Sequence, residues 1–92
     1  MKNLLTIAFI VGLSMPALAN NFSVVENVSF DGTITVVKSS KKYRNVQACQ
    51  AYCDSRSSCA AFVLDLSAGT CTLLKNVKDQ DANEGVISGT KS

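Results

Sequence analysis

Residues 46–74 read VQACQAYCDSRSSCAAFVLDLSAGTCTLL, and this stretch decides the fold. It holds all four cysteines of the chain, Cys49, Cys53, Cys59 and Cys71. The chain is 92 residues long and has no histidine and no tryptophan. A domain of this size rarely folds on an apolar core alone, so the cysteines are the first feature to explain.

Four cysteines can form disulfides, bind a metal or carry redox chemistry, and their spacing separates these uses. The intervals are C-x3-C, C-x5-C and C-x11-C. Structural zinc sites and redox-active pairs both favour C-x2-C, which is missing here. Without histidine, the Ser-His-Asp and Cys-His catalytic systems and histidine metal ligands are excluded. We therefore expect two disulfides, no metal and no cofactor.

The first residues have the pattern of an export signal. Met1-Lys2-Asn3 is a short basic start, residues 4–13 are almost continuously apolar, and Ala17-Leu18-Ala19 ends the segment. This pattern predicts a secretory signal peptide over residues 1–19, cleaved between Ala19 and Asn20. The apolar run is about half of the roughly 20 residues that span a bilayer, so we expect no membrane span in the mature chain. We expect an exported protein, periplasmic or extracellular, where disulfides persist.

The mature chain, residues 20–92, is expected to be a single domain with a nearly balanced charge. Because Lys2 leaves with the signal, the nine basic residues of the chain become eight, against seven acidic ones. This balance argues against a general polyanion binder, and we expect no nucleic-acid partner. The oligomeric state is left open.

Periodicity predicts one helix and several strands, an α+β domain. Strands are expected over residues 22–29, 33–37, 60–64, 70–74 and 85–88, which are rich in β-branched and aromatic residues or alternate polar and apolar positions. Asp31-Gly32 is a dipeptide that lets a hairpin reverse between the first two strands. Residues 38–44 are expected to form a basic loop, after which Asn45 caps a helix over residues 46–53 with both cysteines on one face.

These residues carry a resemblance to a known family. The run Cys49-x3-Cys53-x5-Cys59-x2-Phe62, then Cys71-x-Leu73 and the ending Gly85-Val86-Ile87-Ser88-Gly89-Thr90-Lys91, resembles a PAN/apple domain of the compact bacterial kind, with a core over about residues 27–91. The resemblance implies one helix packed on a curved antiparallel sheet and stapled to it by the bridges Cys49–Cys71 and Cys53–Cys59. Full apple domains also have a third bridge that ties their ends. This chain has no cysteines for it, so we expect freer termini.

The resemblance implies a non-catalytic binding module that recognises a protein or a carbohydrate. The alternatives are a structural subunit of the cell envelope that pairs with a partner protein and, least favoured, a small enzyme. The candidate ligand surface is the densest basic cluster of the mature chain: Lys38, Lys41, Lys42, Tyr43 and Arg44. It could hold a sulfated or carboxylated glycan, an anionic lipid headgroup or an acidic protein patch, or be only a solvated loop. Tyr43 could stack on a sugar or pack against the helix.

A second polar segment, residues 76–84, contains Asp79, Asp81 and Glu84. A calcium site would need a denser alternation of oxygen ligands than this segment offers. We therefore expect a solvated loop here and no metal site.

Overall fold

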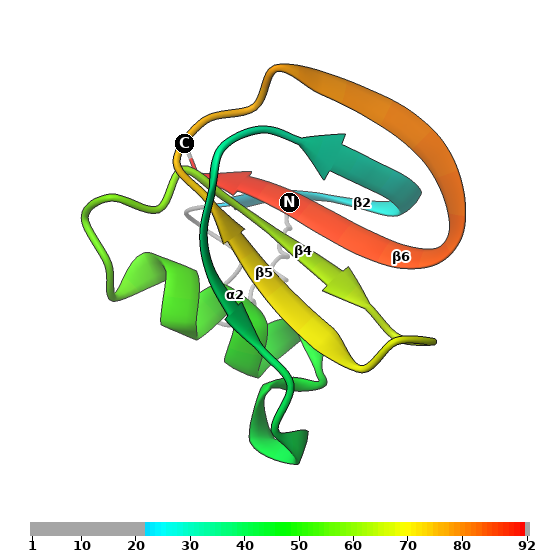
Figure 1. Cartoon of the computed structure of the whole chain (residues 1–92), viewed down its shortest axis with the longest axis horizontal. Coiled ribbons are helices and arrows are strands. Elements are labelled where there is room, and N and C mark those ends of the chain that lie inside the picture. The colour runs from blue at the N-terminus through cyan, green and yellow to red at the C-terminus, as the bar shows by residue number, and fades with distance from the viewer. Residues whose placement is uncertain (1–21, 92) are drawn as a thin grey trace, which may run out of the picture.

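The computed structural model of the chain describes residues 22–91, which form one α-helix against a five-stranded antiparallel sheet (Figure 1). The elements in chain order are strand β2 (Phe22–Asp31), strand β3 (Ile34–Lys38), the 3-10 helix η2 (Lys41–Tyr43), helix α2 (Val46–Asp54), and strands β4 (Ala61–Asp65), β5 (Thr70–Leu74) and β6 (Asp79–Lys91). Across the sheet the strand order is β2-β6-β4-β5-β3. The expected α+β class is confirmed. The predicted signal and its cleavage between Ala19 and Asn20 lie outside the described residues.

Helix α2 begins where the sequence predicts it. The Asn45 side chain accepts a hydrogen bond of 2.8 Å from the backbone N–H of Ala48, which satisfies one of the free donors of the first turn. Cys49 and Cys53 lie four residues apart and therefore share one face of the helix. Both are fully buried, so this is the face that packs on the sheet. Among the described residues, no helix is long and apolar enough to cross a membrane.

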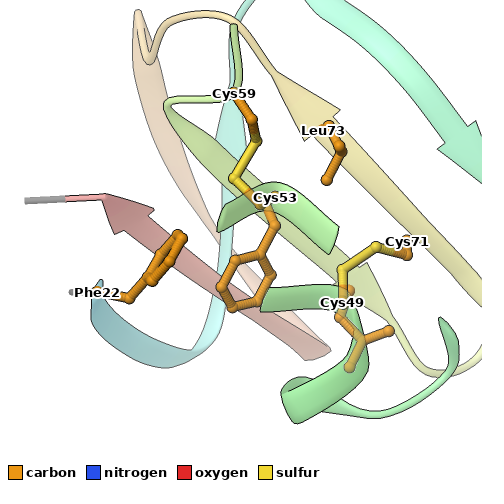
Figure 2. Close-up of a cluster of buried hydrophobic side chains, with 8 residues drawn as sticks. Phe22, Cys49, Cys53, Cys59, Cys71 and Leu73 are labelled. Atoms are coloured by element: carbon orange, nitrogen blue, oxygen red, sulfur yellow. A yellow bond between two sulfur atoms is a disulfide. The ribbon is translucent and has the colours of Figure 1, made fainter. Parts of the chain in front are cut away.

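Two disulfides form the centre of the core between helix and sheet (Figure 2). Cys49–Cys71 joins α2 to β5, and Cys53–Cys59 joins the end of α2 to the segment that enters β4. This is the pairing that the resemblance implies. The bridges pack among Phe22, Phe62, Leu64 and Leu73, and the ring centroids of Phe22 and Phe62 lie 5.7 Å apart. Phe22, at the start of β2, is therefore part of the core, although the resemblance places the core from about residue 27.

Strands β2 and β6 form a long pair that is bent in its middle. Glu26 pairs with Ile87, but Val28, two residues later, pairs with Ala82. Asn27 lies at this irregularity with a φ of 61°, and its side chain accepts a hydrogen bond of 3.1 Å from the Gly85 N–H. Asparagine tolerates this left-handed conformation better than most residues, so Asn27 suits the bend.

Beyond the bend, the pair continues as an outer ribbon, Val28–Asp31 against Asp79–Ala82, which curves away from the rest of β6 in Figure 1. Phe30 packs there in a second buried cluster with Ala61, Val63, Leu74 and Val86. Ala61 and Val63 alternate along β4 with Phe62 and Leu64, which belong to the first cluster, so the two clusters lie on opposite faces of the sheet. The outer ribbon thus covers the face that α2 leaves open.

The expected hairpin at Asp31-Gly32 is wrong, because β2 and β3 lie at opposite edges of the sheet. The chain around this dipeptide pairs with the distant segment 75–78: the Asp31 carbonyl accepts from the Lys78 N–H at 2.7 Å, and the Thr33 carbonyl accepts from the Lys75 N–H at 2.8 Å. Gly32 is needed for this close approach, since a Cβ there would collide with the backbone carbonyl of Asn76. At this dipeptide the chain therefore crosses from one edge of the sheet to the other and does not form a hairpin.

The expected loop over residues 76–84 is also wrong in its second half. β6 begins at Asp79, six residues before the predicted start at Gly85, and residues 79–82 pair with β2. All side chains from Asp79 to Glu84 are exposed, so the segment has no apolar alternation to reveal a strand. Its pairing is held by the backbone.

The two ends of the described chain are joined by strand pairing. Phe22, at the start of β2, pairs with Lys91, at the end of β6. The Lys91 ammonium donates to the carbonyls of Cys53 (3.3 Å) and Arg56 (3.1 Å), at the C-terminal end of α2, where a positive charge is favoured. Backbone pairing and this lysine therefore hold the ends together without a third disulfide, and the expectation of freer ends is not met within residues 22–91.

Candidate ligand-binding surface

Two tyrosines lie side by side where β3, η2 and α2 meet. Tyr43, at the end of η2, and Tyr52, on the second turn of α2, have ring centroids 5.1 Å apart at an interplanar angle of 43°. Both rings are half-buried and pack against the core cluster around the disulfides. Tyr43 therefore packs against the helix, one of the two arrangements expected for it.

Three cations surround this pair of rings. The Lys38 ammonium, at the end of β3, lies 5.9 Å from the Tyr43 centroid and 5.6 Å from the Tyr52 centroid. The Lys42 ammonium lies 5.1 Å from Tyr43, and the Arg56 guanidinium lies 5.6 Å from Tyr52. These distances are within the range of cation–π attraction. We call Lys38, Lys42, Tyr43, Tyr52 and Arg56 the tyrosine–cation patch.

The structure brings together only part of the predicted basic cluster. Lys38, Lys42 and Tyr43 meet in the patch, whereas Lys41 is exposed on η2 and makes no cation–π contact with a ring of the described residues. Arg44 turns elsewhere: its Nη2 donates to the Ser39 carbonyl at 2.8 Å. A Cβ on Gly69 would come within 2.9 Å of the Arg44 Nε, so the arginine lies directly over that glycine.

Arg44 rests on a turn that is itself fixed by Asp65. The Asp65 Oδ1 accepts from the Ser67 N–H (3.1 Å), the Ser67 hydroxyl (2.8 Å) and the Ala68 N–H (3.0 Å). These bonds, the one from the Ala68 backbone first, lower the pKa of Asp65 below its ordinary value, because they favour the charged carboxylate. The turn places Gly69 at a φ of 71° beneath the arginine. Arg44 is thus a positioning residue for the loop that carries η2.

An acidic corner lies on the outer ribbon, away from this patch. Asp31 pairs with Asp79, and Asp81 follows two residues later on the same strand. The negative charge of Asp79, followed by partial desolvation and the charge of Asp31, raises the pKa of Asp81. Within residues 22–91 no group of three or more His, Cys, Asp or Glu residues could hold a metal ion.

The patch presents positive charge beside aromatic rings, a combination suited to anionic groups. Ammonium and guanidinium groups bind sulfate or carboxylate through charge-assisted hydrogen bonds. The patch holds no nucleophile paired with a general base, and it has no histidine to act as one.

The model of the family described as PAN domain matches residues 19–91. This chain belongs to the PAN domain family. A solved structure supports the assignment: the solution structure of a PAN module from Eimeria tenella is 26% identical to this chain, with a TM-score of 0.55, and the match covers 75% of this chain and 78% of that one. No curated protein shows a match to the chain.

Membership confirms the resemblance drawn from the cysteine spacing. PAN domains are generally non-catalytic modules that bind proteins or carbohydrates, and this PAN domain has the expected helix on an antiparallel sheet with two disulfides. Disulfides in a small domain of this family are typical of exported or extracellular proteins.

Sequence reasoning missed Tyr52 and Arg56 in this PAN domain. Tyr52 is next to Cys53 in the helical stretch, but Arg56 lies two residues beyond the end of α2, so helical spacing gave no signal that the two side chains meet. The proximity of Tyr52 to Tyr43 carried no such signal, because it depends on how η2 packs beside α2.

Proposed function

We propose that this PAN domain is an exported, non-catalytic binding module that recognises an anionic protein or carbohydrate ligand through the tyrosine–cation patch. The observation that carries the proposal is the position of Lys38. Its ammonium lies within 6 Å of both tyrosine rings, and each ring has a second cation within 6 Å, Lys42 at Tyr43 and Arg56 at Tyr52. An isolated surface lysine samples many rotamers, whereas these cations are held at a defined place by the rings.

The rings act here as supports for the cations. An ammonium over a ring face still has N–H donors free to bind an anion, so a sulfate or carboxylate group can meet several donors at once. Holding the cations before binding reduces the conformational entropy lost when a ligand arrives. The ligand class that fits this arrangement is a glycan or peptide with closely spaced negative groups.

Export supports the same function, because an exported binding module meets ligands of the envelope or the surroundings. The predicted signal over residues 1–19, with cleavage between Ala19 and Asn20, and the two disulfides both favour this location. Periplasmic and extracellular placement are equally compatible with this chemistry.

The test is a titration of the oxidised domain with a sulfated oligosaccharide and with an unsulfated one of the same length. We expect binding of the sulfated probe only, and weaker binding as salt is raised, because screening weakens exposed charge interactions. Lys42→Ser and Lys41→Ser form a matched pair, since both residues are exposed lysines of η2 and only Lys42 contacts a ring. Lys42→Ser should weaken binding several-fold more than Lys41→Ser.

Equal losses in the two variants would show that only net charge matters and would overturn the patch as the site. Binding of neither oligosaccharide would leave an acidic peptide as the ligand class, tested by a titration with a peptide that has four consecutive glutamates. Failure of that peptide as well would contradict the proposal.

A further inference from the structure

Strand β3 is an open edge of the sheet with exposed apolar side chains. It is the last strand in the order, and β5 is its only neighbour among the described strands. Ile34 is 60% exposed and Val37 is 53% exposed. Between these two residues β3 carries neither proline nor a charged side chain. The bulge after Ile34 and Lys38 at the end of this five-residue strand are features that limit pairing at an edge, so any association here is weak.

A bulge places both apolar side chains on the same face. Ile34 pairs with Leu74 and Val37 pairs with Thr72. Val37 lies three positions after Ile34 on β3, whereas the two partners lie only two positions apart on β5, so β3 has one extra residue here. Leu74 belongs to the cluster under the outer ribbon, so Ile34 and Val37 lie on the face opposite α2. They are therefore separate from the tyrosine–cation patch.

A hollow of about 190 Å³ lies beside Ile34 on this face. Its lining comes from the outer ribbon, from the crossing to β3 and from the middle of the sheet: Ser29, Phe30, Asp31, Gly32, Ile34, Val63, Thr72 and Leu74. The rim next to β3 thus offers apolar surface that an apolar side chain of an added strand can cover.

The two ends of β3 carry opposite charge. Before the strand, the three carboxylates of the acidic corner, Asp31, Asp79 and Asp81, outnumber the two lysines of the adjoining segment, Lys75 and Lys78, and at its end lie Lys38, Lys41 and Lys42. A second strand with the same sequence, added antiparallel, would bring the acidic corner of one copy toward the lysines of the other. A parallel arrangement would bring like charges together.

We propose that β3 is a self-association edge, at which two copies of this chain pair antiparallel about a two-fold axis. The pairing continues the sheet from one copy into the other and places Ile34 of each copy beside Val37 of the second copy. Such an interface is isologous, so it closes at a dimer. A single edge strand buries less than the roughly 1,200 Å² of a stable complex, so the dimer is weak and depends on concentration.

The test measures the molar mass of the oxidised domain by analytical ultracentrifugation between about 10 μM and about 1 mM, the range over which a weak dimer forms. We expect the mean mass to rise toward that of two chains and no further. The rise should shrink at high salt, because the charged ends are exposed.

Val37→Lys should keep the protein monomeric, since it puts a charge at the centre of the proposed contact. Val25→Lys is the matched control: Val25 is 38% exposed on β2, the opposite edge strand, and pairs with Ser88. It should dimerise like the unchanged chain. A circular-dichroism melt checks that each variant is folded, and Ile34→Lys replaces Val37→Lys if the latter is not.

A protein that stays monomeric throughout the range would overturn the proposal, and so would a Val37→Lys variant that still dimerises. If Val25→Lys also abolishes association and the unchanged chain grows beyond a dimer, the edges pair head to tail, and the two-fold arrangement is wrong. Loss of dimerisation in Val37→Lys alone supports it.

Discussion

Gly89 is buried opposite Phe62, with which it pairs in the β4–β6 register. A Cβ at this position would lie 2.5 Å from the Phe62 Cε2, well inside van der Waals contact. The glycine therefore leaves room for Phe62, the largest fully buried side chain of the described residues, which packs beside the disulfides and Phe22.

We expect Gly89→Ala to lower the free energy of unfolding by about 1–3 kcal/mol, as overpacking of a dense core does. Urea unfolding followed by circular dichroism measures the change. Phe62→Leu makes room at the same point, so the double variant should lose less than the sum of the two single losses. Strict additivity would show that the ring and residue 89 do not compete for space.

Asp65 controls the β4–β5 turn through its carboxylate, which accepts three hydrogen bonds from Ser67 and Ala68. Its pKa in the folded state is lower than the ordinary 3.8, chiefly because of the Ala68 N–H. The contribution to stability is therefore fully present above about pH 4 and is lost as the pH falls through the folded-state pKa.

Asp65→Ala should lower the free energy of unfolding by about 1 kcal/mol at neutral pH, a modest value because the group is largely open to solvent. The difference from the unchanged chain should shrink toward pH 2. Urea unfolding at several pH values measures it, with Asp65→Asn as the control that keeps an acceptor but does not titrate. A loss that stays the same at every pH would contradict the role of the charge.

Helix α2 is the element that both disulfides and the tyrosine–cation patch depend on. It is only nine residues long, and isolated helices of this length are marginal in water. Its stability comes from packing of the Cys49 and Cys53 face on the sheet and from its ends, where Asn45 caps the start and Lys91 reaches the carbonyls near the end.

We expect Asn45→Ala to cost about 1 kcal/mol in unfolding free energy, because the Ala48 N–H loses its acceptor. Thermal unfolding detects the loss as a lower midpoint. Asn45→Asp keeps an oxygen acceptor and adds a negative charge at the helix start, so it should be as stable as the unchanged chain or slightly more stable. Equal losses in both variants would mean that the cap is not what matters at this position.

At the scale of the whole molecule, the domain has two small clusters of buried side chains. One cluster lies under α2 and one under the outer ribbon, and the paired ends of β2 and β6 close the domain. The disulfides close loops of different length, with separations of 22 residues for Cys49–Cys71 and 6 for Cys53–Cys59. By loop entropy, these bridges stabilise the fold by about 3.4 and about 2.4 kcal/mol.

Replacing Cys49 and Cys71 by alanine should therefore destabilise the domain by more than replacing Cys53 and Cys59. All four sulfurs are buried, so the two double variants lose similar packing and differ mainly in the loop that is opened. Urea unfolding of the two variants gives the comparison. The opposite order would mean that contacts of the Cys53–Cys59 bridge, such as that of the Cys59 sulfur with the Ala61 carbonyl, outweigh loop entropy.

The sequence by itself determined the parts that local interactions build. Asn45 and the four-residue spacing of Cys49 and Cys53 predict α2 because caps and helical periodicity act within a few residues. Strands β4 and β5, joined by the short turn that ends at Gly69, follow for the same reason from short runs of mostly apolar residues on either side of that turn. The cysteine spacing also led to the PAN family and to its disulfide pairing.

Only the tertiary structure decided how distant segments meet. Phe22 pairs with Lys91, and Asn27 accepts from Gly85 across 58 residues, so the pairing of β2 with β6 depends on which edges come together. Because of this pairing, the chain at Asp31-Gly32 crosses to the opposite edge of the sheet instead of forming a hairpin, and residues 79–84 form part of a strand. The tyrosine–cation patch has the same origin, because Tyr43 and Tyr52 become neighbours only when η2 packs beside α2. Local periodicity has a range of a few residues, whereas the burial of Phe22 and Phe30 on opposite faces depends on the whole sheet.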